Sequence, residues 1–153
     1  MEQEVQKTYK MKWFKFIIYV QLFLGAALMV VQGIPYITGT VYGEMSEVVY
    51  AMWGQSLRIC DVLYGVANII FAIAAIVVRM RLAKFKKNGP LCYLIYFGAQ
   101  GVVGVIYMLT TAIIIGDFPI TSIPSFVGMI VGTGIAIAVN YTYFDNRKEL
   151  FIN

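Results

Sequence analysis

The sequence has no histidine and two cysteines, so it lacks most of the side chains that bind transition metals. Structural and catalytic zinc sites use about three or four nitrogen, sulfur or carboxylate ligands, supplied mainly by cysteine and histidine. Cys60 and Cys92 form no CxxC motif, which excludes thiol–disulfide exchange of the thioredoxin kind. No nucleophile–base pair is recognisable either. We therefore expect no metal, no cofactor and no enzymatic activity.

Charge is also scarce. Charged residues make up 13% of the chain and hydrophobic residues 60%, whereas a soluble domain has about 25% charged and about 45–50% apolar residues. A soluble chain of 153 residues could not hide so much apolar surface in one core. The net charge of +4 does not indicate nucleic-acid binding, because the basic segments contain no aromatic stacking platform. Composition thus predicts an integral membrane protein that binds no nucleic acid.

Four apolar runs are long enough to cross about 30 Å of hydrocarbon as helices. Backbone polar groups cannot be satisfied by lipid, so such runs must be helical. The sequence predicts a single membrane domain, residues 1–153, with an all-α fold: a polytopic four-helix transmembrane bundle. Its spans cover about residues 14–37, 57–78, 91–115 and 122–144.

The first run has a second interpretation, as a cleaved signal peptide. Its apolar length exceeds the usual apolar region of about 7–15 residues, and no clear A-x-A cleavage site follows it. A retained helix is therefore the favoured interpretation.

Lysine and arginine are concentrated in the N-terminal segment, in the connection between the second and third runs, and in the tail. The other two connections contain one basic residue, Arg58, and several acids. The positive-inside rule then predicts that both termini are cytoplasmic in a cell (inner) membrane. We also expect Lys84, Lys86 and Lys87 to attract anionic lipid headgroups.

The first outer connection, residues 38–56, has a helical pattern. Met45, Val48, Val49 and Met52 recur at i, i+3, i+4 and i+7 and form an apolar stripe. This pattern predicts a short interfacial helix or an extension of the second span. An irregular loop with aromatic anchors is the alternative.

Small residues indicate where the helices pack. Lipid supplies no hydrophobic drive for helix association, so close backbone approach and hydrogen bonds must supply it. Gly128-x-x-x-Gly132 in the fourth run is a close-approach motif, and Ala136 continues its face. Gly65 in the second run and Gly104 in the third are the other predicted helix-packing residues.

Arg58 and Asp61 are the one charged constellation within a predicted span. They are three residues apart at the outer end of the second run, and therefore share a helix face. A charged group at the centre of a span costs about 2.5–3.5 kcal/mol, which predicts a mutually neutralised pair. That pair either marks the start of the helix or forms a site for an ion, an anionic small molecule or a partner helix.

Other polar side chains fall at matching depths in neighbouring runs. Asn68 is level with Gln100, and a hydrogen bond between them would contribute about 0.6 kcal/mol, up to about 2 kcal/mol. That bond would either hold two helices together or contact a ligand. The hypothetical ligand or ion path comprises Arg58, Asp61, Asn68, Gln100, Gln32 and Tyr36.

Three segments carry a resemblance. They are Leu57 to Tyr64, the run Arg79-Met-Arg-Leu-Ala-Lys-Phe-Lys-Lys, and the closing Asn140-Tyr-Thr-Tyr-Phe-Asp-Asn-Arg-Lys-Glu-Leu-Phe. Together they resemble small uncharacterised multi-pass membrane proteins of Gram-positive bacteria, over most of the chain. The resemblance implies a bacterial inner-membrane setting and no particular activity.

Two functions remain open from the sequence. The first is a non-enzymatic accessory or regulatory subunit that packs against another membrane protein or against a second copy of itself, through the glycine face of the fourth run. The alternative is a small oligomeric transporter or channel for an ion or small solute, because four short helices leave little room for a pore.

Overall fold

The computed structural model describes residues 11–116 and 123–152, and this part of the chain is helical and contains no strand. The expected all-α fold is thereby confirmed. In chain order the elements are α2 (Lys12–Phe16), the π-helix η1 (Ile17–Leu22), α3 (Phe23–Thr38), the short 3-10 helix η2 (Gly43–Met45), α4 (Ser46–Ala83), α5 (Gly89–Ile115), α6 (Ile123–Asp145) and the 3-10 turn η4 (Lys148–Leu150).

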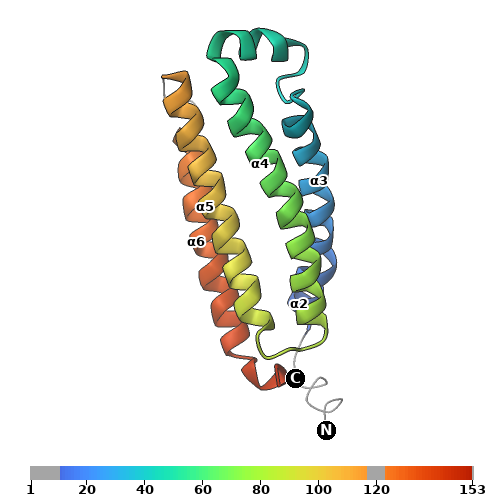
Figure 1. Cartoon of the computed structure of the whole chain (residues 1–153). Coiled ribbons are helices and arrows are strands. Elements are labelled where there is room, and N and C mark those ends of the chain that lie inside the picture. The colour runs from blue at the N-terminus through green and yellow to red at the C-terminus, as the bar shows by residue number, and fades with distance from the viewer. Residues whose placement is uncertain (1–10, 117–122, 153) are drawn as a thin grey trace.

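The long helices run side by side (Figure 1). The arm formed by α2, η1 and α3 packs along α4, α4 packs on α5, and α6 packs chiefly on α5. Within the described residues, three helical stretches are long and apolar enough to cross a membrane, namely Lys12–Ala83, Gly89–Ile115 and Phe126–Asp145. Their composition is compatible with a membrane location.

The first outer connection is mostly helical. Helix α4 already begins at Ser46, and its first two turns lie across the upper end of the molecule in Figure 1. The direction changes at Gly54, whose φ of 75° and ψ of −168° are incompatible with a helix. Only glycine adopts this conformation readily. We call residues 46–53 the cap helix; Val48 and Met52 are exposed along it, and Met45 is exposed directly before it.

Helices α3 and α4 cross at two glycines. A Cβ built on Gly65 would lie 2.8 Å from the carbonyl oxygen of Gly33, and one on Gly33 would lie 3.0 Å from that of Gly65. The two backbones are therefore as close as they can come. The buried face of α4 follows from this crossing, and its members are Leu57, Asp61, Gly65, Asn68, Ala72, Ala75, Val78 and Leu82.

At the lower end, aromatic rings join segments that are distant in sequence. Phe14 from α2 lies 5.2 Å from Phe85 in the α4–α5 connection and 6.0 Å from Phe151 in the tail, measured between ring centroids. Phe85 and Phe151 are 5.7 Å apart. The N-terminal arm, the α4–α5 connection and the tail therefore meet at one end of the molecule.

Polar contacts reinforce this end. The indole of Trp13 donates to Asn140 Oδ1 at 3.1 Å, and the hydroxyl of Tyr93 donates to Gln21 Oε1 at 2.8 Å. The Arg79 Nε donates to the carbonyl oxygen of Ile18, inside the π-helix, at 3.2 Å. Each bond connects the first arm to a different helix, so the arm is fixed to α4, α5 and α6.

Only part of the surface of helix α6 packs against the described residues. Cβ atoms built on Gly101 and Gly104 of α5 would each lie 2.8 Å from a side chain of α6, those of Thr133 and Met129. In contrast, Cβ atoms on Gly128 and Gly132 would meet nothing within 4 Å, and both glycines are exposed. Ala136 is half-buried. The Gly128–Gly132 face thus points away from the rest of the described chain.

Replacing Gly65 by leucine should separate α3 from α4. The new side chain would overlap the Gly33 backbone, and overpacking of this kind costs about 1–3 kcal/mol of folding free energy. Thermal unfolding in detergent micelles should show a lower midpoint. The control is Gly25→Leu on α3, where a Cβ meets nothing within 4 Å. Equal midpoints for the two variants would contradict the crossing.

Candidate functional site

The candidate site is centred on Asp61, the one acidic residue in the described part of the chain that is completely buried. Asp61 lies on the inward face of α4, one turn before Gly65. Tyr107 of α5 donates its hydroxyl to Asp61 Oδ1 at 2.9 Å, and Tyr50 of the cap helix donates to Oδ2, also at 2.9 Å. The carboxyl group therefore joins three segments.

Both carboxyl oxygens accept a hydrogen bond, and this arrangement suits an ionised carboxylate, which has no proton to donate. An unpaired charge in an apolar interior carries a large desolvation cost. Hydrogen bonds to a charged acceptor are about twice as strong as neutral ones and offset part of that cost. The two tyrosines are thus what allows an acid to remain at this depth.

Five tyrosines surround the carboxyl group. Tyr64 and Tyr107 are stacked with ring centroids 4.0 Å apart. Tyr36 of α3 meets both rings edge-on, at 5.1 and 5.7 Å. On the other side, Tyr42 packs edge-on against Tyr50 at 5.6 Å. We refer to Asp61 with Tyr36, Tyr42, Tyr50, Tyr64 and Tyr107 as the tyrosine cluster.

Arg58 does not form the expected ion pair with Asp61. Its Nη2 donates to the carbonyl oxygen of Thr38 at 3.1 Å, and its guanidinium lies over the Tyr50 ring, 5.0 Å from the centroid. The C-terminus of α3 exposes free carbonyl groups that attract a cation. Gly39, with φ of 78°, leaves the space that the guanidinium fills. Arg58 therefore caps the C-terminus of α3. The Tyr50 ring lies between the Arg58 guanidinium and Asp61.

The two tyrosines of the outer connection remain neutral donors at ordinary pH. Burial raises the pKa of the Tyr50 hydroxyl, and its hydrogen bond to Asp61 raises that pKa further. Burial and the nearby Asp61 likewise raise the pKa of Tyr42. A neutral hydroxyl keeps its proton and so continues to donate it.

Asn68, Gln100 and Gln32, which belong to the hypothetical ligand or ion path, form no continuous chain of polar contacts with this cluster. The expected Asn68–Gln100 hydrogen bond is absent: Asn68 is buried and donates to the Tyr64 carbonyl at 3.0 Å, whereas the Gln100 amide lies 4.0 Å from the Met29 sulfur. Gln32 is exposed on α3. Asn68 and Gln100 thus contact different groups and do not pair with each other.

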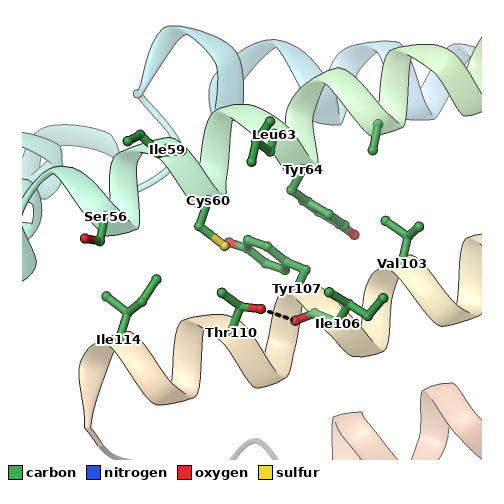
Figure 2. A pocket seen from close by; sticks show the side chains of 11 residues that line it. Ser56, Ile59, Cys60, Leu63, Tyr64, Val103, Ile106, Tyr107, Thr110 and Ile114 are labelled. Carbon is green, nitrogen blue, oxygen red and sulfur yellow. Dashed lines mark hydrogen bonds between the residues drawn. The ribbon is translucent and has the colours of Figure 1, made fainter.

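A lateral pocket of about 320 Å³ opens between α4 and α5 beside the cluster (Figure 2). Tyr64 and Tyr107 form its inner wall, and Ile59, Leu63 and Ile106 contribute apolar surface. Thr110 also lines it, but its hydroxyl donates to the Ile106 carbonyl at 2.8 Å. The pocket therefore suits an apolar group, such as a lipid tail, better than an ion.

For one unpredicted residue of the cluster, Tyr107, the sequence contains a weak signal. Depth matching of the second and third runs places residues near 110 level with Asp61, and Tyr107 is one turn away. The sequence gives no signal for Tyr50, because the change of direction at Gly54 that brings it to Asp61 cannot be inferred from the spacing.

No cluster of three or more cysteine, aspartate or glutamate side chains that could hold a metal ion exists among the described residues. Cys60 and Cys92 are both free thiols. The chain matches no protein-family model, no curated protein and no solved structure. The site must therefore be interpreted from its own geometry.

Tyr107→Phe should destabilise the protein, because it leaves one oxygen of a buried carboxyl group without its donor. An unsatisfied buried acceptor costs about 1–3 kcal/mol. Unfolding in micelles by denaturant would measure the change. Tyr64→Phe is the matched control, since that ring is stacked on Tyr107 but its hydroxyl does not bond to Asp61. Equal losses in both variants would show that the bond to Asp61 is not responsible.

Proposed function

We propose that this chain is a polytopic protein of the bacterial cell membrane, with four spans and both termini in the cytoplasm. We infer that it acts as a non-enzymatic interaction subunit, accessory or regulatory to another membrane protein or assembled with copies of itself. The observation that carries this function is the open glycine face of α6.

The topology is supported by where the basic residues lie. The contacts among Phe14, Phe85 and Phe151 bring the N-terminal arm, the α4–α5 connection and the tail to one end. Together with Arg79 and Arg81 in the last turns of α4, these three segments hold all the lysine and arginine of the described residues except Arg58. Such an asymmetry is typical of the cytoplasmic side of a membrane protein.

The interaction function is supported by the contrast between two pairs of glycines. Side chains of α6 occupy the space beside Gly101 and Gly104. The space beside Gly128 and Gly132 is open, and these two glycines have the i, i+4 spacing of a close helix crossing. Helix α6 packs chiefly on α5, and this second face has no contact with the other described residues. A helix from a partner would approach α6 there as closely as α3 approaches α4 at Gly33 and Gly65.

Native mass spectrometry of the tagged protein, extracted gently from the membranes of its own host, tests this function. We expect homo-oligomers at multiples of 17.2 kDa or a stoichiometric foreign polypeptide. Gly128→Leu and Gly132→Leu should weaken either assembly about tenfold or more, because the partner backbone can no longer approach. Gly25→Leu, another open helical glycine, should assemble normally. A bare wild-type monomer, or intact assemblies in both α6 variants, would refute the proposal.

A small transporter or channel is the second candidate, and the buried Asp61 carboxyl is the observation that favours it. The interaction function predicts that Asp61→Asn and Arg58→Gln leave any ion or solute flux through liposomes at the level of empty vesicles, as for the wild type. Flux in the wild type that either substitution abolishes, with assembly intact, would favour transport instead.

A further inference from the structure

The connection between α4 and α5 is strongly basic and has a defined shape. Arg81, Lys86, Lys87 and Asn88 line a hollow of about 370 Å³, which we call the basic hollow. Among the described residues, no acid contributes to it. Three cations held around one small space attract an anion, and their mutual repulsion favours occupation of that space.

The connection is a tight turn whose shape is fixed by Phe85. The Lys86 amide donates to the Arg81 carbonyl at 3.0 Å and the Phe85 amide to the Leu82 carbonyl at 2.9 Å, which is the hydrogen-bond pattern of a Schellman helix end. This pattern needs one residue with positive φ, usually glycine. Phe85 takes that place with φ of 50°, the only non-glycine residue in the described chain to do so.

A phenylalanine in this conformation is strained, and such strain persists only where surrounding contacts hold it. The Phe85 ring stacks on Phe14 and contacts Phe151, so the side chain is locked into the aromatic end of the molecule. The lysines on either side of Phe85 are exposed. The backbone from which these lysines extend is therefore fixed.

An apolar hollow adjoins the basic one. It measures about 470 Å³, lies between the start of α5 and the end of α6, and shares Lys87 with the basic hollow. Leu91, Leu94, Phe144 and Phe151 supply most of its apolar wall. The acid in this wall, Asp145, lies 4.0 Å from Lys148, which offsets its charge.

We propose that the two hollows together form a binding site for one anionic glycerophospholipid. The phosphate lies among Arg81, Lys86 and Lys87, and an acyl chain enters the apolar hollow along Leu91 and Leu94. A free phosphate would use only the cations. A zwitterionic lipid would use mainly the apolar wall. The site rests on the proposed membrane topology, which places this end at the anionic inner leaflet.

Lipid retention by the full-length protein in detergent micelles tests the site. Phosphatidylglycerol and phosphatidylcholine would be added at equal concentrations and the bound lipid counted by native mass spectrometry. The wild type should retain phosphatidylglycerol preferentially. Lys86→Gln combined with Lys87→Gln should lower its apparent affinity about 25-fold, from roughly fivefold for each lysine near the membrane surface. The matched control, Lys12→Gln with Lys15→Gln, removes two exposed lysines of the same end outside both hollows.

The acyl part of the site has its own test. Leu91→Gln should reduce phosphatidylglycerol retention about fivefold, because Leu91 contributes apolar surface to the hollow. Soluble glycerol phosphate, which has no acyl chain, should not displace the lipid at millimolar concentration. Displacement by glycerol phosphate, equal retention of the two lipids, or an equal loss in the Lys12/Lys15 control would each overturn the proposal.

Failure of this proposal can be distinguished from failure of the interaction function. The Gly128→Leu variant changes α6 far from both hollows and should retain phosphatidylglycerol like the wild type. Conversely, the double lysine variant should assemble normally. Normal lipid retention in a chain that never assembles would leave the lipid site intact and remove only the interaction function.

Discussion

The arrangement of this chain depends on the close crossing of α3 and α4 at Gly33 and Gly65. Neither glycine has room for a side chain, so the two backbones fix each other's rotation as well as their distance. That rotation turns Asp61, one helical turn from Gly65, into the interior and brings Tyr36 beside Tyr64. In lipid, where apolar contact alone does not hold helices together, such a crossing is a main source of specificity.

With Asp61 facing inward, the polar side chains around it bond to two different groups. The tyrosine hydroxyls satisfy the carboxyl group, and the guanidinium of Arg58 satisfies the end of α3. A buried ion pair would give little net stability, because the desolvation of both charges opposes their attraction. Placing Arg58 at the edge, over the Tyr50 ring, keeps its charge nearer to the surface while Tyr50 still links it to the cluster.

Much of the fold can be predicted from the sequence, and less of the site. Apolar length alone predicts the helices, and the Met45 to Met52 spacing predicts the cap helix. The predicted packing role of Gly65 agrees with its close contact with Gly33. Depth matching failed for Asn68 and Gln100, because equal depth does not fix which way each helix is rotated. The contact of Tyr50 with Asp61 could not be predicted, because it depends on the non-helical backbone at Gly54.

On the proposed topology, the π-helix Ile17–Leu22 affects how the protein would adjust to a bilayer. A π-turn inserts an extra residue into the helix, and here the Arg79 guanidinium reaches the Ile18 carbonyl inside it, flanked by the rings of Tyr19 and Phe23. This contact ties the first arm to α4 at the level of the π-helix. On the proposed topology, a thicker or thinner membrane would make the tied pair tilt as a unit or deform the lipid around it.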